Sequence, residues 1–391
     1  MKTREVKLGE VANVKGGKRI PKGIGLINIP NGHPYIRVRD LNNKRLLELD
    51  NSYEYVDNET QKVISKYTVK TGDVVLSIVG TIGLVAIVGR TLDGANLTEN
   101  CVKLSSFHGV NRDFLYYYLR SDCGQQEIRC GTVGAVQAKL PIKNIQNIAI
   151  NLPDYTTQER IASLLLSIDR KIELNQKIND NLLRQAQALY KNRFIDLKPF
   201  NGEMPPDWQL GTVSEIIELH DSKRIPLSSR ERANLTKIYP YYGATSVMDY
   251  VDSYLFDGIY LLLGEDGTVV DDKGFPILQY VEGKFWVNNH AHIITGKNGF
   301  TVETLYLLFS LTNVRSIVTG AVQPKISQAN LNNVSVVIPS KAELSTFNSI
   351  VQPIFSQIRN LRAESDRLTA TRDILLPRLM SGEIDATNIQ L

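Results

Sequence analysis

Acidic side chains between positions 266 and 284 are the residues whose types could most readily support catalysis. Asp266, Asp271, Asp272 and Glu282 precede Lys284, and carboxylates that hold Mg²⁺ beside a lysine form the core of many metal-dependent nucleases. The stretch VEGKFW, however, has the composition of a hairpin turn, and the first half of the chain has no equivalent group of acids. A metal-dependent nuclease therefore stays an alternative and not the favoured function.

His290 and His292 are the next candidates, because alternate positions of a strand could present both imidazole rings to one metal ion. No third ligand is evident, and the corresponding residues of the first half are Cys101 and Lys103. We therefore predict no metal site. Without a phosphate-binding loop or a nucleophile elbow, the sequence also predicts no catalytic residue and no cofactor bound by this chain itself.

The tetrapeptide GAVQ occurs twice, at 134–137 and at 320–323, and a lysine follows two residues later in both places. Other short matches keep the same order: KRIP at 18–21 and 223–226, Gly-Thr at 80–81 and 267–268, and an asparagine at 100 and 289. Matches that keep their order over most of the chain indicate a tandem duplication. A period of about 190 residues corresponds to two similar domains and not to a solenoid.

The distribution of charge favours a polyanionic ligand. Residues 1–45 hold eleven Lys and Arg against three acids, a charge of +8, whereas the whole chain carries +4. Such a local excess is typical of nucleic-acid binding, although a solvated surface explains the composition alone equally well. With 42% hydrophobic and 22% charged residues, the chain has the composition of a globular protein.

Cysteine content and hydropathy predict a cytoplasmic protein that does not enter a membrane. The three cysteines at 101, 123 and 130 are too few for a disulfide framework, which favours a reducing compartment. The most apolar run, at 74–88, is too short for a membrane helix and contains glycines, so we expect two strands there. The start MKTREVK lacks the features of a signal peptide.

For a nucleic-acid ligand, which the charge distribution favours, contacts are predicted at the repeated motifs and at basic positions. The KRIP cations suit phosphate anchoring, and each GAVQ glutamine could bind an adenine edge or a phosphate, unless the motif is only a tight turn. Arg37 and Arg39 alternate on an expected strand and could bind guanine, and the second half has no arginine at that place. The complete predicted set is Lys18, Arg19, Arg37, Arg39, Gln137, Lys139, Lys223, Arg224, His290, His292, Gln323 and Lys325.

Two long segments, 156–194 and 341–376, have the apolar spacing of paired helices. Asn175 lies on the first seam, where a buried amide can fix the register. Pro353 is expected to kink the second helix or to mark a late start, and Pro377 is expected to end it. The remaining parts predict a mixed α/β fold with one amphipathic helix in each half, at 111–128 and 301–315.

The order of these parts predicts two similar globular domains that are separated by two long antiparallel coiled-coil helices. We expect a globular domain at each end of the helix pair, with a pseudo-two-fold axis relating the two. The predicted boundaries are 1–154 for the first domain, 155–197 for the first helix, 198–340 for the second domain, and 341–391 for the second helix with a C-terminal tail.

Four junction segments resemble the specificity subunit of type I restriction–modification systems: QERIA (158–162), ALYKNRF (188–194), GEMPPDWQLGTVSEI (202–216) and RDILLPRLMSGEI (372–384). The resemblance covers the whole chain, the globular halves only in outline. It implies two target recognition domains, each binding one half of a split double-stranded DNA sequence, and helices that set the gap between the halves. It also implies a non-catalytic chain that binds two methylation subunits, which use S-adenosylmethionine for adenine-N6 methylation, and a restriction/translocase subunit.

The ends of both long helices contain more apolar residues than one seam requires, so they are predicted docking surfaces for these partners. The residues concerned are Leu189, Tyr190, Phe194, Leu376 and Leu379. A DNA-binding protein that acts alone, or a scaffold whose helices bind some other protein, is the alternative that the sequence leaves open.

Overall fold

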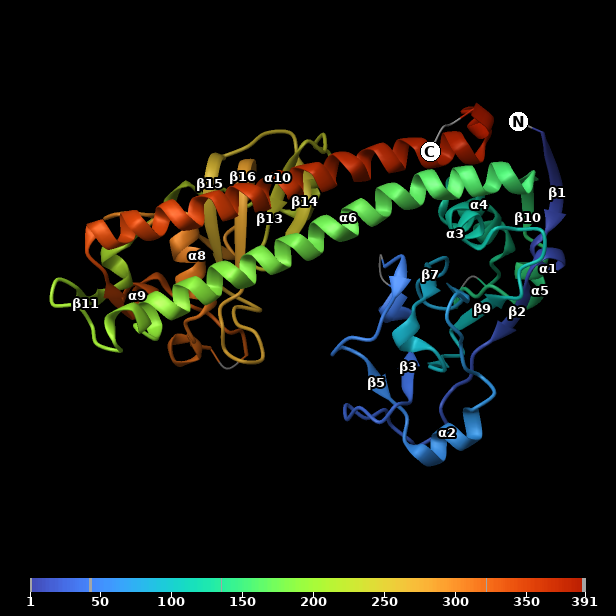
Figure 1. Cartoon of the computed structure of the whole chain (residues 1–391), viewed down its shortest axis with the longest axis horizontal. Helices are drawn as coiled ribbons and strands as arrows, with labels where there is room; N and C mark the ends of the chain where they lie inside the picture. The colour runs from blue at the N-terminus through green and yellow to red at the C-terminus, as the bar shows by residue number, and fades with distance from the viewer. Residues whose placement is uncertain (1, 42–43, 135, 321, 389–391) are drawn as a thin grey trace. The chain divides into compact units, whose positions relative to one another are not determined.

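The chain separates into two compact units in the computed structural model (Figure 1). The structure describes residues 2–41, 44–134, 136–320 and 322–388. Unit 1 comprises Met1–Glu173 and Glu364–Leu391, and unit 2 comprises Leu174–Ala363. The two long helices, α6 (Tyr155–Tyr190) and α10 (Lys341–Met380), each contribute one part to each unit.

A five-stranded sheet with the order β2-β9-β6-β7-β4 forms the body of unit 1. Its strands are β2 (Asn13–Gly16), β4 (Leu46–Leu47), β6 (Val74–Ser77), β7 (Val85–Val88) and β9 (Cys101–Ser105). β6 and β7 pair antiparallel, which confirms the two strands expected in the apolar run. Every residue of both strands is buried because alternate side chains enter two different cores, one on each face of the sheet.

Smaller sheets and short helices complete the globular part of unit 1. β1 pairs antiparallel with β10, and a three-stranded sheet has the order β5-β3-β8. The bounds are β1 (Thr3–Lys7), β3 (Pro34–Ile36), β5 (Glu54–Tyr55), β8 (Asn96–Leu97), β10 (Ala149–Pro153), α1 (Leu8–Val11), α2 (Asn58–Ile64), α3 (Arg112–Arg120), α4 (Asp122–Gly131) and α5 (Ile142–Gln146). The single helix expected over 111–128 is wrong, because Ser121 ends α3 and its hydroxyl caps α4.

Unit 2 is built on a six-stranded sheet with the order β12-β17-β15-β16-β13-β14, and β11 pairs antiparallel with β18. The bounds are β11 (Gln209–Thr212), β12 (Ile217–Leu219), β13 (Tyr239–Tyr242), β14 (Val247–Val251), β15 (Phe256–Gly264), β16 (Leu278–Val287), β17 (Ala291–Gly296), β18 (Ser335–Ile338), α7 (Ser229–Ala233), α8 (Val302–Ser310) and α9 (Gln328–Asn332). The order β12-β17-β15-β16 repeats the order β2-β9-β6-β7 of unit 1. The shared order confirms two similar mixed α/β domains.

The parts of α6 and α10 within each unit pack antiparallel. In unit 1 Asp169 and Lys171 pair with Arg372 and Glu364, so the numbers rise along α6 while they fall along α10. In unit 2 Tyr190 packs against Phe347 and Arg193 pairs with Glu343, which shows the same direction. The antiparallel helix pair is therefore confirmed in each unit, whereas the pseudo-two-fold relation between the units stays a prediction.

Details of the long helices differ from the sequence-based expectation at the prolines. α10 begins at Lys341, so Pro353 does not mark its start, and it continues past Pro377 to Met380. The prediction that Pro377 ends the helix is wrong, because the residues that follow it, Leu379 and Met380, are buried in the core of unit 1 and this burial offsets one missing hydrogen bond. Asn175 is fully buried, as its position on the seam predicts.

Candidate nucleic-acid interface

The described residues of each GAVQ motif lie in an exposed loop that is closed by a pair of backbone hydrogen bonds, and Ala135 and Ala321 lie outside the described residues. In unit 1 Val133 and Lys139 exchange two bonds of 2.9 Å, and in unit 2 Thr319 and Lys325 exchange bonds of 2.8 and 2.7 Å. The motif is therefore a tight turn, as one of the two sequence-based interpretations holds. The turn leaves the side chains of its glutamine and of its lysine exposed in both units, where they can contact a ligand.

A glycine is required at the start of both loops. Gly134 has φ +98° and Gly320 has φ +87°, in the left-handed region that L side chains rarely adopt. A Cβ atom at these positions would lie 2.6 Å from the carbonyl oxygen of Gln137 and 2.3 Å from that of Gln323. The first letter of GAVQ is thus fixed by the backbone, and only the later letters are available for recognition.

Two further segments lie beside the GAVQ loop in the same way in both units. Leu140 donates a backbone hydrogen bond of 2.9 Å to Ile78, next to the Gly-Thr turn, and Ile78 donates one of 2.8 Å to Asn100. In unit 2 the corresponding bonds run from Ile326 to Glu265 (2.8 Å) and from Glu265 to His290 (2.8 Å). The repeated Gly-Thr turn, the segment before β9 or β17 and the GAVQ loop therefore form one surface in each unit.

The KRIP motif joins this surface in unit 1. The backbone nitrogen of Lys18 donates to the carbonyl of Leu97 (2.8 Å), and the exposed guanidinium of Arg19 pairs with Glu99 at 2.5 Å. The hydrogen bond from Arg19 to Glu99 raises the pKa of the guanidinium, which keeps its full charge at neutral pH. Lys18 and Arg19 are thus exposed cations, as predicted, beside a loop that leads into β9.

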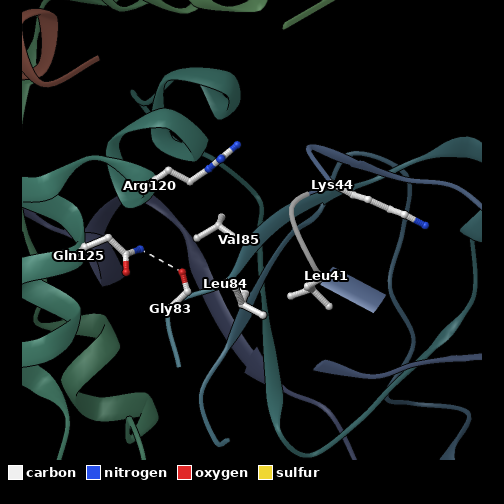
Figure 2. Close-up of a pocket in the computed structure, with 7 residues that line it drawn as sticks. All are labelled: Leu41, Lys44, Gly83, Leu84, Val85, Arg120 and Gln125. Atoms are coloured by element: carbon white, nitrogen blue, oxygen red, sulfur yellow. Dashed lines mark hydrogen bonds between the residues drawn. The ribbon is translucent and has the colours of Figure 1, made fainter. Parts of the chain in front are cut away.

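The Gly-Thr turn of unit 1 is held by α4. Gln125 donates hydrogen bonds to the carbonyls of Gly83 (3.0 Å) and Leu119 (2.7 Å), as Figure 2 shows for Gly83. The same residues border a hollow of about 180 Å³ whose lining also includes two cations, Lys44 and Arg120. Lys44 is paired with Asp50, whereas Arg120 donates to the neutral hydroxyl of Tyr116 and belongs to no ion pair among the described residues.

A lysine-lined hollow of about 310 Å³ lies beside Lys18, and sequence reasoning missed it. Its lining includes three lysines and an aromatic ring: Lys15, Lys66, Lys103 and Tyr67. Lys15 and Lys103 stand directly opposite each other on β2 and β9, an arrangement of like charges that disfavours the sheet unless an anion lies nearby. Lys103 pairs with Asp73 at 3.3 Å, and Lys18 lies 5.6 Å from the Tyr67 ring centre. The pairing of Lys15 with Lys103 depends on strand register, which the sequence does not show.

Arg37 and Arg39 share one acidic partner and do not lie on a strand. β3 ends at Ile36, so the expected alternation on a strand is wrong. Both guanidiniums bind Glu54, Arg39 at 2.7 Å, and burial lowers the pKa of Arg37. Arg39 is about half-exposed and can still meet DNA, whereas the pairing of Arg37 with Glu54 leaves it poorly placed to do so.

Arg224 and His292 are members of a buried polar network in unit 2. Arg224 Nη1 lies 2.5 Å from Glu265, His292 Nδ1 lies 2.6 Å from Asp221, and His292 Nε2 lies 2.8 Å from the carbonyl oxygen of Ile326. Burial would raise the pKa of Asp221 and Glu265, but His292 and Arg224 outweigh it, so both pKa values lie below the ordinary range. These contacts stabilise the fold where β17 begins.

The predictions that Arg224 and His292 contact DNA are therefore wrong for this structure. His292 has no exposed surface, and its partner across the strands is Leu263, just as the buried Val102 faces Leu76 in unit 1. The expected equivalence of His292 with Lys103 is one residue out of register. Arg224 is only 13% exposed, because it donates its hydrogen bonds inward.

The other predicted contacts of unit 2 remain at the surface. Lys223 is exposed, and no ion pair involves it within the described residues. His290 is partly exposed and bound to Asp266, and Lys325 is about half-exposed at 3.2 Å from Glu265. The two histidines do not face one metal ion, since each binds a different carboxylate.

Residues 2–184 and 205–370 match the model of the type I restriction modification DNA specificity domain. The chain belongs to this family. It is 24% identical over 377 residues to the type I restriction enzyme MjaIX specificity subunit of Methanocaldococcus jannaschii, covering 90% of this chain and 86% of that protein. It is 21% identical over 348 residues to the HindI specificity subunit of Haemophilus influenzae, covering 66% and 73%. The fold is similar to that of a type I restriction–modification S subunit from M. genitalium (TM-score 0.59, 16% identity, 97% and 96% covered).

Family membership makes the chain the specificity subunit of a restriction–modification system, whose catalysis belongs to other subunits. The acids proposed for a nuclease do not gather: Glu282 lies near Arg359, and Asp271 accepts hydrogen bonds from the backbone of its own turn. Among the described residues, Asp221, Glu265 and His292 have the spacing of metal ligands. Their side chains already bind one another and Arg224 in the buried network described above. No helix in the described ranges is long and apolar enough to cross a membrane.

Most residues predicted to dock partner subunits lie inside the units. Tyr190 and Phe194 pack against Trp208 and Phe347 in the core of unit 2, and Leu379 is fully buried in unit 1. Their prediction as exposed docking residues is wrong, because the additional apolar positions anchor each helix end to its own globular part. Leu376 is partly buried in the same core as Leu379. Leu189 is 41% exposed and stays a predicted docking residue.

Proposed function

We propose that this specificity subunit binds a bipartite double-stranded DNA target, with unit 1 contacting one half-site and unit 2 the other. The observation that carries the proposal is the convergence of the repeated Gly-Thr turn and GAVQ loop on one exposed surface in each unit. The two units differ in their charged side chains elsewhere, as the Arg37–Glu54–Arg39 cluster and the lysine hollow of unit 1 illustrate. Shared residues suit the DNA backbone, which both half-sites have in common, and differing residues suit base recognition.

The proposal extends to the partners. Two methylation subunits and a restriction/translocase subunit would assemble on this chain, and the methylation subunits would bind S-adenosylmethionine and methylate adenine N6. α6 and α10 would set the number of unspecified base pairs between the half-sites. We expect the location to be cytoplasmic, where the DNA is.

The experiment compares the purified chain with its complex with the methylation subunits encoded by the same host. The chain alone should transfer no methyl groups and cleave no DNA, while the complex should methylate adenine in a sequence-specific way. Mg²⁺-dependent cleavage by the chain alone that is lost in Glu282→Ala would contradict the proposal and favour the nuclease alternative.

A further inference from the structure

The tip of each GAVQ loop carries an apolar side chain that makes almost no contact with the protein. Val136 and Val322 expose 103% and 99% of their reference surfaces, more than any other large hydrophobic residue described here. An exposed valine is common on protein surfaces, but the same valine at the same place of a duplicated loop is not explained by chance exposure. Neither core includes these side chains, so folding does not require them.

The base of each loop is held in a defined position. The backbone bonds of the Val133–Lys139 and Thr319–Lys325 pairs close each loop, and Lys139 and Lys325 also form isolated bridges with Val79 and Asp266 beside the Gly-Thr turns. In unit 2 Gly267 additionally donates a backbone bond of 2.9 Å to Pro324. A narrow loop that is fixed at its base presents a small apolar group at its end, with a glutamine next to it and a lysine at its base.

The ligand that the two loop tips contact must offer the same chemical groups to both units, because the two tips are identical while their surroundings differ. DNA duplex meets this condition, since base stacking and phosphates are common to every half-site. Minor-groove proteins that kink DNA insert apolar side chains between base steps, and they use cationic and amide side chains beside the wedge to read the groove. The exposed Lys139 at the base of the loop of unit 1, which belongs to no ion pair among the described residues, favours DNA over a protein partner.

We propose that the two loop tips are apolar wedges that enter the DNA at equivalent positions of the two half-sites, with Val136 and Val322 against the bases. This inference rests on the proposed function, in which each unit binds one half-site. Gln137 and Gln323 then lie at the groove edge, and Lys139 and Lys325 face the adjacent phosphates. The wedge acts together with the methylation subunits, because a target adenine inside a duplex must leave the stack before it is modified.

The test uses the complete complex with its methylation subunits and a duplex that contains the motif which this complex methylates. Two duplexes are prepared, one for each half-site, in which 2-aminopurine replaces a base next to the target adenine. The fluorescence of 2-aminopurine rises when it leaves the base stack. The variants are Val136→Ser and Val322→Ser, each tested on both half-sites. Val63→Ser, at an exposed valine of α2, is the matched control. Val136→Leu keeps an apolar tip and should retain the signal.

Each serine variant should reduce the fluorescence rise and the methylation rate at its own half-site by about tenfold, because an apolar contact is lost, and should leave the other half-site unchanged. Equal behaviour of Val136→Ser and Val63→Ser would overturn the proposal. Loss of methylation subunits from the complex, measured by native mass spectrometry, would also overturn it and assign the tips to protein docking. If the wild-type complex methylates no bipartite motif, the proposed function fails and not the wedge alone.

Discussion

The lysine hollow of unit 1 is where substitution should change DNA binding most measurably. Lys15 and Lys66 line it, and Lys18 lies beside it over the ring of Tyr67. None of the three belongs to an ion pair described for this structure, so each can neutralise a phosphate. Lys103 is excluded from this set because Asp73 already compensates its charge. We predict that replacing the three lysines by alanine weakens binding to matched and unmatched DNA by similar factors.

The magnitude follows from counterion release. Each neutralised phosphate contributes about −0.9 to the slope of log affinity against log salt concentration. Three lost contacts should therefore flatten the slope by about 2.7, and raising the salt from about 50 to about 200 mM should cost the wild type about 40-fold more affinity than it costs the variant. Lysines that neutralise a phosphate only partly would change the slope by less than about 2.7, but the change would still be above zero.

The assay is fluorescence anisotropy of a labelled duplex with the assembled methylation complex at several salt concentrations. Lys62→Ala is the matched control, because Lys62 is an exposed lysine of unit 1 that is already paired with Glu59. The control should leave the slope unchanged. If the triple variant has the slope of the wild type, the hollow does not face DNA.

Three further outcomes are expected. Asp169→Ala should destabilise unit 1 by about 3 kcal/mol, measured by urea unfolding with circular dichroism, because it leaves Arg372 without its buried partner at 2.9 Å; a loss below about 1 kcal/mol would contradict this. Burial would raise the pKa of Glu303, but hydrogen bonds from Tyr280 and Gln352 leave it below the ordinary value. The wild type should therefore have a larger free energy of unfolding than Glu303→Gln above about pH 5, and this difference should disappear as the pH falls below about 4. Unfolding is followed by the fluorescence of the two tryptophans, which both lie in unit 2. A difference that does not change with pH would contradict this prediction. Inserting four residues after Gln176 adds about 6 Å of helix and should change the gap in the methylated motif by one or two base pairs, while altered half-site bases would contradict the spacer role.

The duplication could be predicted because the matches are identities of sequence, and the matching strand orders confirm it. The long helices could be predicted because their apolar period extends over ten turns or so. The side-chain environment of single residues in the sheets could not be predicted. Side chains alternate between the two faces of a sheet, so an error of one residue in the register moves a side chain to the opposite face. His292 is the clearest case, because the matched asparagines at 100 and 289 made it the equivalent of Lys103. The strand pairing instead places it opposite Leu263, which makes it the equivalent of the buried Val102.

Identical short motifs also acquired different environments, which sequence alone does not reveal. Arg19 and Arg224 occupy the same place in KRIP, yet Arg19 is exposed and Arg224 is turned inward by Glu265, a residue that the first half replaces with Ile78. Tyr190 and Phe194 look like additional apolar surface on a helix, because their partners Trp208 and Phe347 are distant in the sequence. Long-range contacts of this kind decide which predicted site residues reach the surface.

The most direct test of the central claim is single-molecule sequencing of adenine methylation in a host with and without this gene, and with a chain in which the globular part of unit 2 is replaced by that of a related specificity subunit. We predict a bipartite motif that depends on the gene, and in the chimaera one half of the motif should change while the other half is kept. A contiguous motif, or a chimaera in which both halves change together, would contradict the assignment of one half-site to each unit.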